Sequence, residues 1–391
     1  MRKLFLTTAL ALSIGLAVGL PALAHEPSGI AETRVIAFPK LQDGRYVLAV
    51  DLHTHSVFSD GSVWPDVRVG EAKRDGLYAM AVSEHLEYQP KAVDIPHPDR
   101  NRSYQLATQA AEVKPDATGP DSRPLMVING SEITKLTIQP GHINAVFITD
   151  ANKLLGTNPL DQLKAANAQG AFVFWNHPFW TAQTPNGVAT LTPMHKDFIK
   201  QGLLHGIEVA NGADMSDEAF RIALDNKLTI LGTSDIHGLI DWDYDLENGA
   251  KRTATLVLTR SETPDGLKAA LKAGDTVAIY NGNLAGRKEN VEAVVRSTLR
   301  IEVDKPMDKT TVVPVSVIND SPIPYMIENM GPEGFYDEGQ VFTVKPGSKF
   351  TLLVKNVPDA SKLNLTLKLL NTYTAPREHL SVTLRDSTKA N

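Results

Sequence analysis

The residues of this chain most suited to chemistry are histidines and carboxylates in short polar motifs. The chain has 391 residues, 11 histidines and no cysteine, which excludes thiolate metal sites, disulfides and a cysteine nucleophile. Six histidines lie at the ends of predicted strands, and three carboxylates join them as candidate donors. The nine residues are His53, His55, Asp60, His85, Glu132, His142, His177, Asp235 and His237. Nitrogen and oxygen donors without sulfur suit divalent ions such as Zn, Mn or Fe(II).

The number of these donors predicts more than one metal ion. About four to six ligands complete the coordination shell of such an ion, so nine donors indicate two or three ions. A single His-x-His pair is weak evidence, and the position of the motifs is more informative. Residues two apart in a strand point the same way, so His53 and His55 can face one pocket, as can Asp235 and His237.

Alternating strands and helices are expected to position these motifs. Between about residues 45 and 283, short apolar runs alternate with helix-like stretches, which is typical of βα units around a parallel sheet. The predicted strands are Tyr46–Asp51, Tyr78–Ser83, Leu125–Asn129, Ile143–Ile148, Ala171–Trp175, Gly206–Val209, Leu228–Gly232 and Thr253–Leu258. About seven or eight such units favour a closed, TIM-like α/β barrel, in which residues at the carboxyl ends of the strands converge on one face.

The composition changes near Arg300. Five runs beyond it alternate apolar and polar residues, and turns such as Lys345-Pro346-Gly347 separate them. This pattern predicts an all-β sandwich over residues 297–391, following the barrel over residues 45–290 and an N-terminal segment over residues 25–44. The sandwich holds no catalytic constellation, and its single histidine is His379.

Residues 1–24 have the pattern of a secretory signal peptide. Arg2 and Lys3 precede an apolar run, and Ala22 and Ala24 are the small residues that a signal peptidase reads. An uncleaved membrane anchor is the alternative. No later run approaches the roughly 18 apolar residues of a spanning helix. We therefore expect an exported protein, periplasmic in a Gram-negative cell and without a membrane contact after cleavage.

The order of the motifs resembles that of the polymerase and histidinol phosphatase (PHP) family over about residues 45–285. The matching elements are His53-x-His55, Ser59-Asp60-Gly61, Glu84-His85, Gly-x-Glu132, His142, Asn-His177-Pro and Asp235-x-His237. The resemblance implies a distorted (β/α)7 barrel that holds a trinuclear metal site and hydrolyses phosphate esters. The C-terminal sandwich lies outside the family pattern.

Carried over to this chain, the resemblance assigns three metal positions. The first would be bound by His53, His55, Glu132 and Asp235. The second would share Glu132 and add His142 and His177, and the third would take Asp60, His85 and His237. Some members have histidine in place of Asp60, and many read Thr-Asp-His where this chain has Ser83-Glu84-His85. Glu84 is therefore expected to orient its neighbours.

The metals imply the mechanism. A hydroxide that bridges two ions, positioned by Glu132 and Asp235, is expected to attack phosphorus in line. The alternatives are a phosphomonoesterase of the same family, a metal-dependent hydrolase of another ester or amide bond, and a non-enzymatic metal- or ligand-binding protein. Metal identity and oligomeric state stay open.

The expected substrate is a small phosphate ester. The formal net charge of −6 argues against nucleic acid as the main partner, because binding its phosphate backbone needs a basic face. Aromatic residues near the motifs and few cations favour a phosphodiester with apolar or aryl groups, although the rings could simply pack the barrel mouth. The substrate candidates are Lys135, Asn211 and Trp180, and Arg100, Arg102, Lys251 and Arg252 lie in loops that could also reach the pocket.

Overall fold

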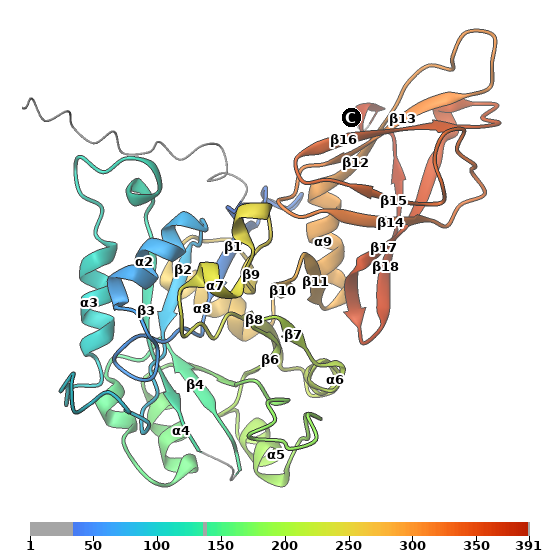
Figure 1. The fold of residues 1–391 in the computed structure, drawn as a ribbon. Coiled ribbons are helices and arrows are strands. Elements are labelled where there is room, and N and C mark those ends of the chain that lie inside the picture. The colour runs from blue at the N-terminus through green and yellow to red at the C-terminus, as the bar shows by residue number, and fades with distance from the viewer. Residues whose placement is uncertain (1–33, 136–138, 390–391) are drawn as a thin grey trace, which may run out of the picture.

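The computed structural model describes residues 34–135 and 139–389 (Figure 1). The predicted signal peptide, residues 1–24, lies outside the described residues. The described chain forms a mixed α/β region followed by a C-terminal β domain. None of its helices is long and apolar enough to cross a membrane.

A mixed sheet frames the α/β region. Its neighbouring strands are, in order, β9 (Ala254–Thr259), β1 (Tyr46–Asp51), β2 (Ala79–Val82), β3 (Met126–Ile133), β4 (Ile143–Val146), β5 (Phe172–Trp175), β6 (Gly206–Asn211) and β8 (Thr229–Thr233). The pairs β1–β2, β2–β3, β5–β6 and β6–β8 are parallel. β4 runs antiparallel to both its neighbours, and β9 runs antiparallel to β1. The sheet is therefore only partly the parallel sheet expected.

The sheet is strongly curved. One buried apolar cluster contains side chains from strands far apart in the sheet order. Val257 of β9, Val50 of β1, Phe174 of β5 and Leu231 of β8 all belong to it. A flat sheet could not bring these strands to one cluster. Between β8 and β9, the hydroxyl of Thr255 accepts a hydrogen bond from the Gly232 N–H (3.1 Å) and donates one to the Gly232 carbonyl (2.8 Å).

Most helices of this region begin at a capping side chain or a proline. They are α2 (Pro65–Arg74), α3 (Arg102–Ala111), α4 (Pro159–Ala168), α5 (Pro193–Lys200), α6 (Asp217–Asp225), α7 (Ile240–Asp243) and α8 (Pro264–Ala273). The sequence marks both ends of α8. The Thr263 hydroxyl accepts a hydrogen bond from the Gly266 N–H, and Gly274 ends the helix with a φ of 76°, a conformation that glycine adopts without a steric penalty.

The C-terminal domain consists of two packed layers of strands that share one apolar core, and the second layer continues the sheet of the α/β region. The first contains β12 (Leu299–Val303), β13 (Val313–Asn319) and β16 (Ser348–Val354). The second contains β14 (Tyr325–Asn329), β15 (Val341–Val344), β17 (Asn364–Ala375) and β18 (Glu378–Arg385). Alternate residues of these strands, such as Val315, Val317 and Leu367, are fully buried, as expected for two sheets packed face to face.

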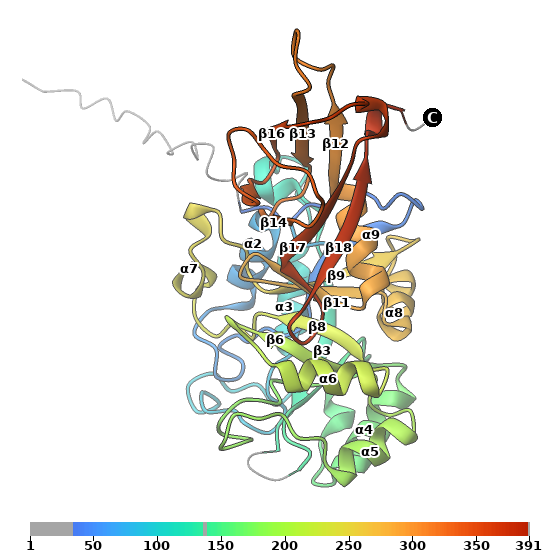
Figure 2. The ribbon, with the colours of Figure 1, turned by 90° about the vertical axis from the view of Figure 1, so that its right-hand side faces the viewer.

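The two regions are joined by backbone hydrogen bonds as well as by a linker. α9 (Lys288–Thr298) leads from one to the other. β10 (Thr276–Tyr280) and β11 (Asn283–Gly286) extend the first sheet beyond β9, and β11 pairs in parallel with β17. As a result, the β17–β18 hairpin reaches α6 and β7 (Asp214–Met215), as Figures 1 and 2 show.

Candidate metal centre

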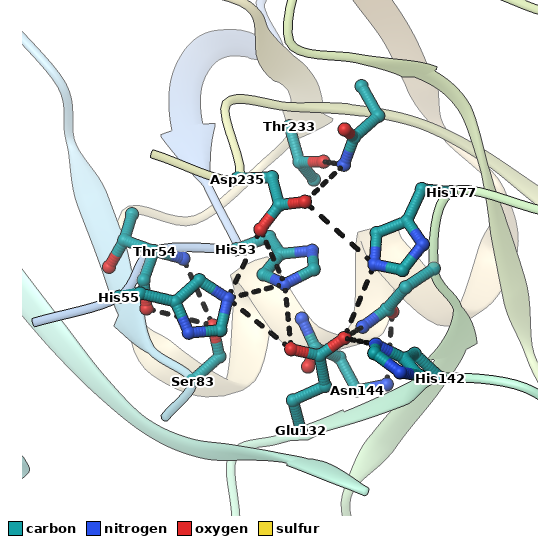
Figure 3. Close-up of polar contacts among 12 residues, drawn as sticks. His53, Thr54, His55, Ser83, Glu132, His142, Asn144, His177, Thr233 and Asp235 are labelled. Atoms are coloured by element: carbon teal, nitrogen blue, oxygen red, sulfur yellow. Dashed lines mark hydrogen bonds and ion pairs between the residues drawn. The ribbon is translucent and has the colours of Figure 1, made fainter. Parts of the chain in front are cut away.

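The predicted donors meet at one end of the curved sheet, and Figure 3 shows the central ones. His53 and His55 follow β1, and their Nε2 atoms are 2.9 Å apart. Each Nε2 lies 3.3 Å from Glu132 Oε2 and 3.1 Å from Asp235 Oδ1. These four side chains therefore direct two nitrogens and two oxygens at one small volume.

The remaining donors surround the two carboxylates Glu132 and Asp60. Glu132 Oε1 lies 2.8 Å from His142 Nδ1 and 3.4 Å from His177 Nε2. Asp60 lies 3.3 Å from His85 Nε2 and 3.1 Å from His237 Nε2. His85 Nδ1 is also 3.0 Å from Glu132 Oε2, which connects the two groups. All nine predicted donors thus lie in one continuous cluster.

Two ligand positions have an unusual backbone conformation. His177 follows β5 with a φ of 26°, and Asp235 follows β8 with a φ of 51°. Residues other than glycine rarely adopt positive φ, and the cost is about 1–3 kcal/mol each. Hydrogen bonds hold both positions: the His177 N–H donates to Glu208 Oε2 (2.6 Å), and the Asp235 N–H donates to the His53 carbonyl (3.0 Å).

The cluster creates a strongly negative environment. Burial alone would lower the pKa of His53, but the carboxylates of Asp235, Glu208 and Glu132 raise it well above its usual value. The pKa of His85 is raised to about 10, because Glu132 and Asp60 outweigh its burial. Conversely, burial would raise the pKa of Glu132, and the surrounding imidazoles hold it well below its usual range. Such a site stabilises added positive charge.

The donor set fits divalent metal ions. His142 Nε2 and Asp235 Oδ1 are buried and make no hydrogen bond. Buried polar atoms nearly always have a partner, so these two atoms indicate that a partner such as a metal ion is missing. The 2.9 Å between the Nε2 atoms of His53 and His55 also agrees with neighbouring ligands of an octahedral ion, which are about 3 Å apart when each metal–nitrogen bond is about 2.1 Å. Several groups of three or four donors are close enough to share an ion.

Glu208 is a buried functional carboxylate that the sequence prediction missed. Its Oε1 accepts hydrogen bonds from His53 Nδ1 and the Thr233 hydroxyl, both at 2.7 Å. Its Oε2 accepts from the backbone N–H of His177 and from Asn211 Nδ2 (2.9 Å). The sequence did contain a signal, because Glu208 is a carboxylate in the middle of the apolar strand β6. A carboxylate buried there needs hydrogen-bond or charged partners.

Glu84 lies behind the predicted donor His55, with Ser59 between them. Its carboxylate accepts hydrogen bonds from the hydroxyls of Ser56, Ser59 and Ser103. The Ser59 hydroxyl in turn lies 3.3 Å from His55 Nδ1. The structure thus places Glu84 one step behind the donors, as an orienting residue.

The three substrate candidates lie in different environments. Trp180 lines the cavity above the donors, with its ring edge-on to His142 and His177 at 5.5 and 5.3 Å. Asn211 also lines it, although its amide is bound to Glu208. Lys135 is not part of the lining, because its ammonium pairs with Glu87 at 2.6 Å.

The cavity has a volume of about 370 Å³, and its lining in the described chain contains no lysine or arginine. Its lining consists of Asp60, His85, Glu132, His142, His177, Phe179, Trp180, Thr181, Asn211, Asp214, Asp235 and His237. The nearby arginines have other partners. Arg100 donates to the carbonyls of Leu86 and His97, and Arg252 is buried against Asp51. Recognition of a ligand here therefore depends on metal, aromatic rings and neutral polar groups.

Comparisons with known proteins cover both regions. A family model described as an Ig-like domain matches residues 299–385. A solved two-domain protein from Bacteroides vulgatus ATCC 8482, described as containing a predicted PHP-like metal-dependent phosphoesterase, is 35% identical over 90% of this chain and 98% of its own, with a TM-score of 0.79. No curated protein matches the chain.

Two further solved structures are more distant. PsfC from Pseudomonas syringae PB-5123 is 19% identical over 64% of this chain and 96% of its own, with a TM-score of 0.41. The lesion-specific endonuclease PfuEndoQ from Pyrococcus furiosus is 16% identical over 62% of this chain and 59% of its own, with a TM-score of 0.40.

Proposed function

Because this chain belongs to the PHP-like metal-dependent phosphoesterases, we propose that it hydrolyses small phosphodiesters with apolar or aryl ester groups. The observation that carries this proposal is the cavity itself. Nine nitrogen and oxygen donors gather beneath it, and its described lining contains aromatic rings but no lysine or arginine.

The proposed metal content is two to three ions of Mn, Zn or Fe. His53, His55, Glu132 and Asp235 would hold one ion, and Glu132 would share a second with His142 and His177. Asp60, His85 and His237 would hold the third. When bound, such ions supply an activated water and neutralise charge that develops on the phosphoryl oxygens.

Two carboxylates are assigned to positioning the attacking water. Glu132 contacts imidazoles on both sides, through Oε1 to His142 and through Oε2 to His85. Asp235 lines the cavity, and its Oδ1 takes part in no hydrogen bond. An oxygen that lies 3.1 Å from two imidazole nitrogens of the donor cluster is well placed to orient a reactant there.

The charge of the lining favours a diester over a monoester. A phosphate monoester is close to a dianion near neutral pH, and proteins usually recognise it with arginine or lysine. The predicted cation Lys135 is instead paired with Glu87. A diester carries one charge, and its ester groups can pack against Phe179 and Trp180, which line the cavity.

We extend the proposal to the closed barrel and to export. The apolar cluster shared by β1, β5, β8 and β9 supports a distorted (β/α)7 barrel. The pattern of residues 1–24 supports a periplasmic location, with cleavage after Ala24. N-terminal sequencing of protein recovered from the periplasm should begin at His25, and an intact Met1 would contradict cleavage.

Turnover of three esters with a common leaving group tests the proposed function. The purified protein is assayed for metal content and for turnover of bis(p-nitrophenyl) phosphate, p-nitrophenyl phosphate and p-nitrophenyl acetate. We expect the diester to be preferred and a chelator to abolish activity. Preference for p-nitrophenyl phosphate would identify a monoesterase. Activity on the acetate alone would overturn the phosphoesterase proposal, and bound metal without any turnover would indicate a binding protein.

A further inference from the structure

A second cavity lies where the Ig-like domain meets the α/β region. It has a volume of about 440 Å³ and is lined by residues of both: Phe179, Gly187, Met215, Ser216, Asp217, Glu218, Tyr280, Tyr373 and Arg377. Tyr373 belongs to β17 and Arg377 to the turn after it, so the β17–β18 hairpin forms one wall. Figures 1 and 2 both show this hairpin beside α6.

The hairpin is held in place by two kinds of contact. The backbone of Tyr373 is in register with Ala285 of β11, in the sheet of the α/β region. Beyond it, Arg377 Nε lies 2.8 Å from Asp217 Oδ2 at the start of α6. Backbone pairing fixes the wall more firmly than an exposed ion pair alone could.

The second cavity adjoins the cavity above the metal donors. Phe179 lines both of them. The two-residue strand β7 divides them elsewhere: Asp214 lines the first cavity and Met215 the second. The two cavities therefore meet at Phe179, which is where a substituent longer than the first cavity would enter the second.

The chemistry of the second cavity suits an uncharged ring. Its apolar lining consists of Phe179, Tyr280, Tyr373 and Met215. The polar groups at its edge are bound to one another, since Asp217 pairs with Arg377 and the Ser216 hydroxyl donates to Glu218 (3.0 Å). A sugar would need hydrogen-bonding groups that are not already paired with one another. An aromatic ring instead needs apolar contacts, which the rings of Phe179, Tyr280 and Tyr373 can provide.

We propose that this cavity is a subsite for one ester group of the diester substrate, a group that ends in a flat, uncharged ring. The Ig-like domain thereby contributes Tyr373 to substrate recognition. The inference rests on the proposed phosphodiesterase function and names the substrate class more closely.

Three p-nitrophenyl phosphodiesters that differ only in the second ester group test this subsite. The groups are methyl, phenyl and 4-phenylbutyl, and the leaving group is the same in all. With the metal-loaded, full-length protein we expect kcat/KM to be about 10-fold higher for the 4-phenylbutyl ester than for the methyl ester, as for an added group in an apolar pocket.

Variants at Tyr373 test whether this residue causes the preference for the longer ester. Tyr373→Leu keeps an apolar side chain but removes the ring, and should reduce the ratio of the two kcat/KM values to about 1. Tyr373→Phe should keep the ratio. Tyr336→Ala is the matched control, because Tyr336 is an exposed tyrosine of the same domain that does not line the cavity, and it should also keep the ratio.

The outcomes separate the subsite from the function on which it rests. Turnover of the methyl ester with no preference for the longer ester, or a preference that Tyr373→Leu leaves intact, would overturn the subsite and leave the function standing. If no diester were hydrolysed by the metal-loaded protein, both the function and the subsite would be wrong.

Discussion

Glu208 Oε1 lies 2.7 Å from His53 Nδ1, and both side chains are fully buried. This hydrogen bond fixes the ring of His53 so that Nε2 points at His55 and Asp235. The other oxygen of Glu208 accepts the backbone N–H of His177, so one carboxylate of β6 positions donors that follow β1 and β5. Carboxylates behind a histidine ligand orient the ring and raise its basicity.

Replacing Glu208 by glutamine should weaken metal binding without removing a metal ligand. The expected loss of affinity is about 10–100-fold, because Glu208→Gln removes the charge behind His53. Competition with a chelator of known affinity measures it, and kcat should fall with metal occupancy while excess metal restores part of it. Glu289→Gln, at an exposed position of α9, is the control. Equal affinities for Glu208→Gln and wild type would assign Glu208 a purely structural role.

Removing Glu132 or Asp235 should remove both metal and activity. Either change to alanine deletes an oxygen that faces two imidazoles of the cluster, and turnover should fall about 100-fold or more. Elemental analysis should find at least one ion fewer per chain. An active variant with its full metal content would contradict the assignment. His379→Ala, in the Ig-like domain, should leave turnover and metal content unchanged.

Arg68 is expected to stabilise the loops that carry the ligands. Its buried guanidinium donates to the carbonyls of His55 (2.8 Å) and Gly238 (2.5 Å) and pairs with Glu71 at 2.6 Å. Arg68→Met leaves the Glu71 carboxylate buried without its partner, so unfolding free energy should fall by about 3–5 kcal/mol. Urea unfolding of metal-free protein measures this change.

Two further variants make the Arg68 prediction specific. Adding Glu71→Leu to Arg68→Met removes the unpaired charge and should recover part of the loss. Arg74→Met breaks an exposed pair with Asp241 (3.7 Å) and should cost less than about 1 kcal/mol. If Arg68→Met cost no more than Arg74→Met, the proposed clamp on the ligand loops would be wrong.

His195 should make the protein less stable in acid. Burial against Trp175 lowers the pKa of His195 to about 4, although the hydrogen bond to the Pro140 carbonyl opposes this shift. The pKa is about 6.5 in the unfolded chain. Between these values the unfolded chain binds a proton that the folded chain does not, so stability rises with pH and levels off above about 6.5. Acidification from pH 7 to pH 5 should cost about 2 kcal/mol through this residue.

A variant without the imidazole isolates this contribution from other titrating groups. His195→Gln should be less stable than wild type at pH 7, because it loses the contact with Trp175. Its decline between pH 7 and pH 5 should nevertheless be about 2 kcal/mol smaller. Parallel declines for the two proteins in urea unfolding would show that His195 is not the sensitive group.

Much of the fold follows from local pattern, and strand direction is the main exception. The predicted strand Tyr46–Asp51 is confirmed residue for residue. β4 is antiparallel to β3 although a parallel sheet was expected. The connection between Ile133 and Ile143 is too short for a parallel crossover, which needs about a dozen residues or more. The length of this connection, rather than the apolar pattern, could have predicted the direction of β4.

The donors could be predicted because they stand in motifs at strand ends, whereas the groups behind them could not. Nothing in the run Ile207-Glu208-Val209 shows that the carboxylate faces His53, because that contact joins residues far apart in the chain. Lys135 illustrates the opposite problem. It is near Glu132 in sequence, but Glu87 takes up its charge, and only the folded chain reveals that partner.

The parallel pairing of β11 with β17 also limits how the protein can be divided. A chain shortened before the Ig-like domain would leave the outer edge of β11 with unpaired N–H and carbonyl groups, next to the fully buried side chains of Leu284 and Ala285. Open, apolar strand edges invite self-association. A shortened protein is therefore expected to aggregate even though every proposed metal ligand is still present in it.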